Sequence, residues 1–230
     1  MPLSEDLNEY VKEVFEDTFE TQNTTSVPDS TDIKLGNHAK KLDGVVLYAD
    51  MSESTQLVDS KKKWFSAKVY KSYLYCAAKI IRKMNGTIVS YDGDRIMAVF
   101  VGGSKNTNAV KAGLKINYAR LKIINPAIDK KHGAGTYTLN HTVGIDSGNL
   151  YVARTGIRGS NDLVWIDRSA NHAAKLCELS NATPTWITKE VYDSAATEAK
   201  FTDGKSMWVE KNWTKTGRTV YCSTWHWKCD

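Results

Sequence analysis

The sequence predicts an α+β fold in which an antiparallel sheet carries helices mostly on one face. Three observations predict it: an apolar run that ends in a carboxylate, an Asp-Gly pair between two β-rich runs, and helical stripes on either side of that pair. The resulting order, β-α-β-β-α-β with added hairpins, is typical of a sheet covered by helices. Hydrophobic residues make up 41% of the 230 positions and charged residues 25%, which is a globular composition and not a disordered one.

We expect residues 1–43 to form an N-terminal helix and linker, ahead of one domain over residues 44–230. Apolar residues from Leu3 to Phe15 recur at helical spacing, and acidic residues occupy the other face. The polar stretch at 21–30 has no periodicity, which indicates a linker or a loose wrap over the body.

The core begins with the apolar run at residues 45–50, which predicts a buried strand. A helical stripe over about 62–84 follows, and Asn85-Gly86 ends it. Two strands, at 87–91 and 95–100, then flank an Asp-Gly turn, which is a strong hairpin signal.

The second half of the chain repeats these signals. A helix over about 107–124 is expected to end at Asn125-Pro126, because the residue before proline disfavours helical geometry. The remaining elements are, in order, a hairpin pairing 138–146 with 149–154 across Ser147-Gly148, a strand at 163–166, an alanine-rich helix at 169–179, and short strands with helical turns over 187–230.

Charge is unevenly placed along the chain. The net charge is +5, but the first 20 residues hold seven acids and one base, so the other 210 residues carry +11. A basic body suits a polyanion such as nucleic acid, a membrane surface or nucleotide phosphates. The four cysteines show no zinc spacing, no apolar run approaches the roughly 18 residues of a membrane span, and the acidic N-terminus is unlike a signal peptide. We therefore expect a cytoplasmic protein with reduced thiols.

Two carboxylates occupy matching places in the first core elements. Asp50 closes the first strand and Asp94 lies in the turn of the next hairpin. If those strands are neighbours, both side chains emerge at one sheet edge, where oxygen ligands suit Mg²⁺ or Mn²⁺ bound to a triphosphate. Each residue alone could equally be a cap or an ordinary turn residue.

Three segments resemble the motifs of class III nucleotidyl cyclases. Residues 46–52 resemble the first metal motif, residues 93–100 the second, and residues 143–148 the central hairpin. The resemblance runs from about residue 44 to residue 180. It implies the palm-like βαββαβ fold of that family and a head-to-tail homodimer with active sites at the subunit interface.

The resemblance also implies roles for particular residues. Asp50 and Asp94, with the main-chain carbonyl of Met51, would bind two divalent ions, Mn²⁺ or Mg²⁺. Asn171 and Lys175, four apart on one helix face, would reach the ribose and phosphates of the opposite subunit's substrate. Lys175 replaces the arginine usual in the family and loses its bidentate fork.

The base-reading positions differ from those of purine cyclases. Ser90 and Val164 stand where purine cyclases carry a lysine and an aspartate or threonine. Residues 154–176 closely resemble the pyrimidine cyclases of bacterial Pycsar antiphage systems, including Lys175, although Asp167 replaces a usual glycine. The resemblance implies a uridylate or cytidylate cyclase whose product acts on a separate effector.

A candidate pyrimidine pocket follows from this resemblance. Tyr48 is two residues before Asp50 and points to the same strand face, where its bulk would shrink the pocket. The other pocket candidates are Ser90, Val164 and Trp165, and the candidate phosphate contacts are Arg154, Arg158 and Arg168. Trp165 could equally pack in a core, and each arginine could be a surface or interface residue.

The expected reaction converts UTP to 3′,5′-cyclic UMP and pyrophosphate, in antiphage defence. Uracil is favoured over cytosine by resemblance alone, so CTP stays an alternative substrate. A pseudo-cyclase that binds nucleotide without chemistry is a second alternative, and a nucleic-acid binder a third. We expect neither nucleic acid nor a membrane as partner.

Overall fold

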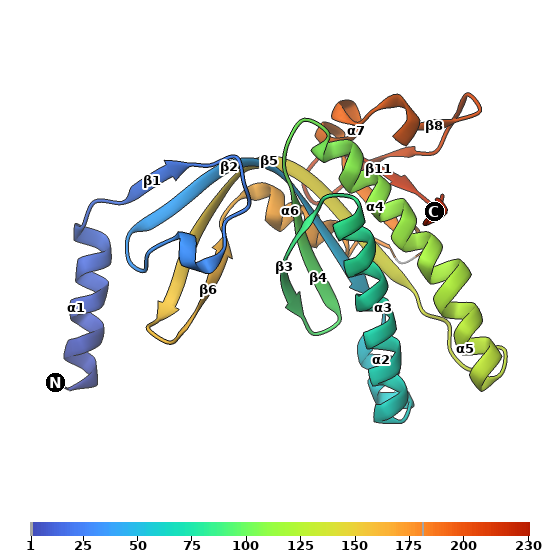
Figure 1. Cartoon of the computed structure of the whole chain (residues 1–230), viewed down its shortest axis with the longest axis horizontal. Coiled ribbons are helices and arrows are strands. Elements are labelled where there is room, and N and C mark those ends of the chain that lie inside the picture. The colour runs from blue at the N-terminus through green and yellow to red at the C-terminus, as the bar shows by residue number, and fades with distance from the viewer. Residues whose placement is uncertain (1, 181) are drawn as a thin grey trace. The chain divides into compact units, whose positions relative to one another are not determined.

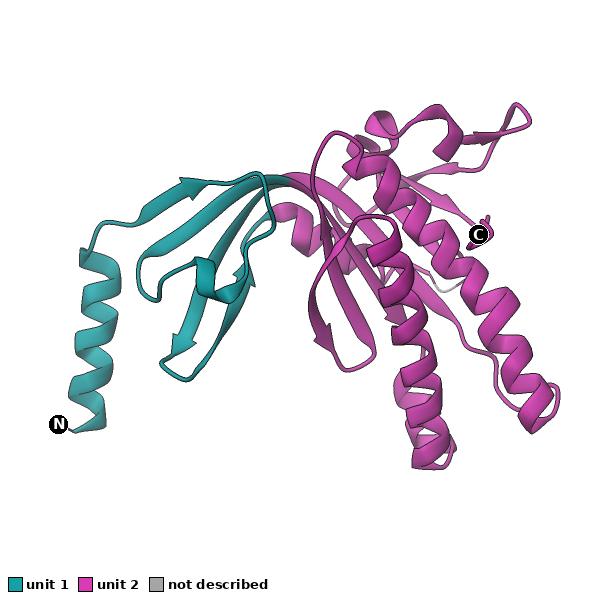
Figure 2. Cartoon of the chain, in the orientation of Figure 1, with its two compact units in different colours: residues 1–43, 149–167 teal, residues 44–148, 168–230 magenta. Residues whose placement is uncertain are grey.

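A computed structural model describes residues 2–180 and 182–230, and the chain divides into two compact units (Figure 2). Unit 1 comprises the chain up to Asp43 together with Asn149–Asp167, and unit 2 comprises Gly44–Gly148 and Arg168–Asp230. Two long strands, β2 (His38–Met51) and β5 (His141–Ile157), each contribute residues to both units. No helix in the described ranges is long and apolar enough to cross a bilayer.

Unit 1 contains α1 (Leu3–Glu16), β1 (Glu20–Asn23), the short helix η1 (Ser30–Asp32) and β6 (Ser160–Trp165). The predicted helix at the start is confirmed. The linker prediction is wrong for β1, which pairs in parallel with the first residues of β2. All four β1 residues are exposed, so backbone hydrogen bonds form this strand without any apolar alternation that the sequence could reveal.

Unit 2 is built on a sheet in the order β10-β11-β7-β5-β2-β4-β3 (Figure 1). Its strands beyond β2 and β5 are β3 (Thr87–Asp92), β4 (Arg95–Phe100), β7 (Thr185–Thr188), β10 (Val209–Trp213) and β11 (Arg218–Ser223). β7 is parallel to β5, while β4 is antiparallel to both β2 and β3. The α+β class and the β3–β4 hairpin are therefore confirmed.

Helices cover the two faces of this sheet unequally. Val45, Leu47 and Ala49 alternate on the face that packs against α3 (Lys63–Lys83) and α4 (Lys105–Ala119), and form the main core. The opposite face receives α6 (Arg168–Leu176). The remaining elements are α2 (Ser54–Ser60), α7 (Lys189–Ser194), η3 (Thr197–Ala199), β8 (Phe201–Thr202) and β9 (Lys205–Ser206).

The second core helix does not stop at Pro126. A π-helical turn, η2 (Arg120–Ile124), joins α4 to α5 (Asn125–His132), and the three run on as one rod (Figure 1). Pro126 lies just after this π-helical turn, so its missing amide hydrogen falls where the regular α-helical hydrogen bonding is already interrupted. The sequence signal therefore marked an irregular turn and not the end of the helix.

The predicted turn at Ser147-Gly148 is also wrong. β5 runs through both residues, and the hairpin closes further on, where Ile157 pairs with Ser160 around Arg158-Gly159. Gly159 has a φ of +86°, which glycine adopts without strain, so it is the residue that makes the turn. Gly148 lies within β5, which pairs with β7 before it and with β6 after it.

Candidate active site

Asp50 and Asp94 lie at the same sheet edge. β2 pairs with β4 so that Asp50 is opposite Arg95, the residue that follows Asp94. The amide of Met51 donates a hydrogen bond to the carbonyl oxygen of Asp94 at 3.4 Å, which ties the end of β2 to the β3–β4 turn. Gly93, with a φ of +59°, makes that turn. The two strands are thus neighbours, as the sequence argument required.

Arg95 is a site residue that sequence reasoning missed. Its Nη2 donates to Asp50 Oδ2 at 2.9 Å, and the two side chains are only 31% and 19% exposed. Burial raises the pKa of Asp50, and the bond from Arg95 acts in the opposite direction. The Asp-Gly-Asp-Arg sequence already places an arginine beside the proposed metal ligand Asp94. Only the strand register shows that this arginine binds the Asp50 carboxylate.

Tyr48 and Ser90 are brought into one cross-strand row. Tyr48 pairs with Met97 on β4, and Met97 pairs with Ser90 on β3. Paired residues of antiparallel strands point to the same face, so this row lies on the face that also carries Asp50. The Arg95 guanidinium lies 5.7 Å from the Tyr48 ring centre, and burial raises the pKa of the Tyr48 hydroxyl.

Gly144 lets α6 approach this face closely. A Cβ atom at Gly144 would overlap the main-chain oxygen of Ala173 on α6. Just beyond the helix, Cys177 Sγ donates to the Tyr48 carbonyl oxygen at 3.6 Å, and burial raises the pKa of this thiol. Glycine in the 143–148 motif therefore serves helix packing.

Asn171 and Lys175 occupy the exposed side of α6. Within the described residues, neither side chain forms a hydrogen bond or ion pair with Asp50 or Asp94 of its own chain. The structure therefore brings the two aspartates together, and leaves the Asn171 and Lys175 pair presented outward from the same unit.

A buried carboxylate lies against the first turns of α6. Asp146 is fully buried, and its Oδ1 accepts hydrogen bonds from the Thr188 hydroxyl at 2.6 Å and the Ser147 amide at 2.7 Å. The other oxygen lies 3.2 Å from Nδ1 of His172, close enough for an ion pair but not aligned for a hydrogen bond. His172 neighbours Asn171, so Asp146 lies beside the turn of α6 that presents Asn171.

The remaining candidates divide between the units. Val164 and Trp165 lie on β6 and Arg158 in the β5–β6 turn, all in unit 1. Arg154 forms hydrogen bonds within unit 1: its Nε donates to Asn161 Oδ1 at 2.7 Å and its Nη1 donates to the Ile33 carbonyl oxygen at 3.3 Å. Arg168 begins α6 in unit 2 and is exposed.

The donor set at the sheet edge fits a hard divalent cation bound together with substrate. Among the described residues, no third His, Cys, Asp or Glu joins two others to form a metal-binding cluster. Asp50 and Asp94 would therefore supply two carboxylates and leave other positions to main-chain, water or phosphate oxygens. Magnesium is typically held in this way, through one or two carboxylates and substrate phosphates.

Two relatives that are similar to the chain over its full length are named uridylate cyclases. A uridylate cyclase from Burkholderia cepacia is 51% identical over 229 residues, which cover 99% of each chain. A uridylate cyclase from Xanthomonas perforans is 46% identical over 232 residues, covering all of both chains. No protein-family model matches the chain.

Solved structures show the same fold at low sequence identity. The adenylyl cyclase CyaB from P. aeruginosa superposes with a TM-score of 0.68 at 20% identity, covering 80% of this chain and 95% of that one. The guanylyl cyclase Cya2 gives a TM-score of 0.66 at 17% identity, with 81% and 94% covered.

Proposed function

The chain belongs to the uridylate cyclase family and is a pyrimidine nucleotide cyclase, and we propose that it converts UTP to 3′,5′-cyclic UMP and pyrophosphate. The observation that carries the proposal is the pairing of Asp50 with the β3–β4 turn that holds Asp94. That edge offers two carboxylates to a triphosphate and its counter-ions.

The reaction joins two parts of one substrate. The ribose 3′-oxygen attacks the α-phosphorus in line, a new O3′–P bond forms, the bond to the pyrophosphate oxygen breaks, and the 3′-hydroxyl proton leaves to solvent. Two divalent ions, Mg²⁺ or Mn²⁺, would supply charge neutralisation of the phosphates and a lower pKa for the 3′-hydroxyl. Asp50, Asp94 and the carbonyl oxygen of Met51 are the groups that would hold them.

The protein's own contribution is positioning and charge. Asn171 orients the ribose and Lys175 neutralises the α-phosphate, both from a partner copy in a homodimer. Their exposure on α6 supports this assignment, because both side chains are accessible to a partner copy. Holding the reacting groups in line accounts for much of the rate in such transfers.

Recognition of the base falls to the face beside Asp50. The row of Tyr48, Met97 and Ser90 offers two hydroxyls and an apolar side chain. Hydroxyls both donate and accept, so they match either pyrimidine edge, while the bulk of Tyr48 disfavours a purine. Val164, Trp165, Arg154, Arg158 and Arg168 stay candidates for further base and phosphate contacts.

The biological role follows from the family resemblance. The cyclic nucleotide would act as a second messenger on a separate effector in antiphage defence. The cyclase reaction does not depend on this biological role, so the reaction can be tested on the purified protein by itself.

Incubation of the purified protein with each of the four NTPs and Mn²⁺ tests the proposed function. Cyclic UMP from UTP, identified by mass spectrometry, is the expected product. Cyclic CMP as the dominant product would move the assignment to CTP. No cyclic product from any of the four would overturn the cyclase mechanism in favour of nucleotide binding alone.

A further inference from the structure

The apolar side of α1 is uncovered in unit 1. No residue of the helix is buried, and Leu7 is 54% and Phe15 85% exposed. Leu3, Leu7, Val11 and Phe15 are each four residues apart and Tyr10 is three from Leu7, so the five form one stripe about three turns long. An isolated helix of 14 residues is marginal in water, and tertiary packing of the apolar side is what normally stabilises it.

Unit 2 contains a groove that matches this stripe in length. The groove has a volume of about 570 Å³ and lies between α3, from Phe65 to Cys76, and the η2–α5 rod, from Ile123 to His132. At 1.5 Å per residue, the α3 wall is roughly 16 Å long and the α1 stripe roughly 18 Å. We call it the α3–α5 groove.

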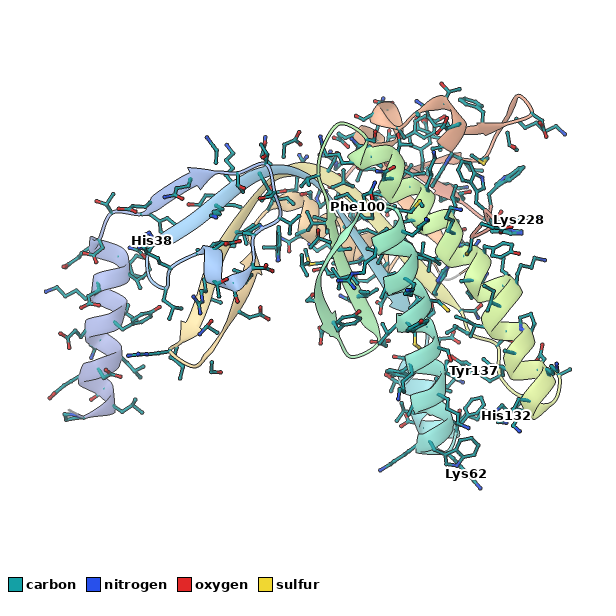
Figure 3. The ribbon with its side chains drawn as sticks, in the orientation of Figure 1. His38, Lys62, Phe100, His132, Tyr137 and Lys228 are labelled. Atoms are coloured by element: carbon teal, nitrogen blue, oxygen red, sulfur yellow. The ribbon has the colours of Figure 1, made fainter. Side chains whose placement is uncertain are left out.

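The floor of the α3–α5 groove is apolar. Val69 and Cys76 line it from α3, and Ile124 and Ile128 from the opposite wall. Tyr75, 66% exposed, stands at its edge. One end is closed by aromatic packing, in which the Phe65 ring centre lies 5.0 Å from that of His132 and 6.0 Å from that of Tyr137. Figure 3 labels His132 and Tyr137. An amphipathic helix is the usual occupant of such a groove.

The charges of the helix and the groove are opposite. α1 carries five acidic residues and one basic residue, whereas α3 carries six basic residues and no acidic one. Lys68, Lys71 and Lys131 line the groove, and no carboxylate of the described residues pairs with them. On α1, Asp6 and Glu13 flank the apolar stripe, so they would face these lysines.

We propose that α1 of one copy lies in the α3–α5 groove of a second copy. The proposal uses the homodimer of the proposed function but adds a contact that the cyclase chemistry does not require. Apolar packing of the stripe supplies the stability, and the opposite charges favour the correct partner and register.

Disulfide trapping tests the location of α1. Cys76 lies in the groove, so Leu7→Cys should form an interchain disulfide with Cys76 when oxidised with copper–phenanthroline. A non-reducing gel and peptide mass spectrometry identify the bond. Lys12→Cys, on the opposite side of α1, is the matched control, and Leu7→Cys with Cys76→Ser should give no covalent dimer.

Charge exchange gives an independent test. Asp6→Lys with Glu13→Lys should weaken dimerisation about tenfold, as should Lys68→Glu with Lys71→Glu, while an equal mixture of the two variants restores wild-type affinity. Sedimentation velocity measures the dimer dissociation constant of each variant and of the mixture. Lys79→Glu with Arg82→Glu is the control, because both lie on α3 outside the groove.

The results separate the alternatives. A disulfide within one chain would place α1 in its own groove and overturn the proposal, as would equal trapping at Lys12→Cys or no trapping at all. Cyclic UMP production is measured separately. Cyclic UMP production without the interchain disulfide would contradict only the proposed location of α1. The disulfide without cyclic UMP production would contradict only the proposed function.

Discussion

Arg95 Nη2 lies 2.9 Å from Asp50 Oδ2, so an arginine holds a carboxylate that we assign to the metal site. The two residues are direct partners in the β2–β4 pairing, which makes the contact a consequence of strand register. The arginine supplies positive charge at the edge where the triphosphate and its counter-ions are proposed to bind.

Arg95→Ala tests this relationship. Removing a bond to a half-buried carboxylate should lower the free energy of unfolding by about 1–3 kcal/mol. Mn²⁺ should restore more stability to the variant than it adds to the wild type, because the cation replaces the lost charge. Urea unfolding with and without Mn²⁺ measures both quantities, and Asp50→Asn with Arg95→Ala is the control. Equal Mn²⁺ effects in wild type and Arg95→Ala would contradict the assignment.

Mixing two inactive variants tests the shared active site. Asp94→Ala and Lys175→Ala should each lose cyclic UMP production, because one lacks a proposed metal carboxylate and the other a proposed phosphate contact. If the proposed homodimer shares its sites between subunits, random exchange in an equal mixture makes about half the dimers mixed, each with one intact site, so roughly a quarter of wild-type activity returns. A mixture as inactive as its components would mean that both residues act within one chain.

Tyr48 should control the choice of base. Tyr48→Phe keeps the bulk and loses the hydroxyl, so kcat/KM for UTP should fall about tenfold or more while purine triphosphates stay poor substrates. Tyr48→Ala also removes the bulk and should admit ATP or GTP. Steady-state kinetics with all four NTPs distinguishes the two effects. Unchanged base preference in Tyr48→Ala would remove Tyr48 from the pocket.

Gly144→Ala should displace α6. The new methyl group would overlap the Ala173 carbonyl oxygen, at a cost of about 1–3 kcal/mol in unfolding free energy. Gly103→Ala is the matched control, since no atom of the described residues lies within 4 Å of a Cβ there. The displaced helix should also lower activity, because it carries Asn171. If Gly144→Ala has the same unfolding free energy as Gly103→Ala, α6 can shift away from the sheet at no cost, which would contradict this prediction.

His141 should make stability depend on pH. It is fully buried and has no hydrogen-bond partner among the described residues, and burial, with Arg120 adding to it, lowers its pKa well below its usual range. The folded state therefore keeps it neutral, while the unfolded chain gains a proton below about pH 6.5. This contribution is present above that pH and is lost as the pH falls.

His141→Leu removes this dependence. Between pH 7.5 and 5.5 the wild type should lose about 1 kcal/mol more unfolding free energy than the variant. Urea unfolding at the two pH values provides the measurement. Parallel losses in the two proteins would show that His141 does not titrate on unfolding.

Much of the fold could be predicted because its signals are local. The apolar run before Asp50, the helical stripe of α3 and the Asp-Gly turn between β3 and β4 each follow from residues close in sequence. The exposed strand β1 and the continuous β5 could not, because pairing partners far along the chain decide whether a polar or glycine-containing segment is extended.

By itself, the sequence determined the residue types of the candidate site and their order: two aspartates at strand ends, and an asparagine and lysine one helical turn apart. Only the tertiary structure decided that Arg95 pairs with Asp50, that Tyr48 and Ser90 share a row, and that Gly144 seats α6. The reason is register: a shift of one residue between two strands turns every side chain to the other face, and no local pattern fixes that choice between strands 45 residues apart.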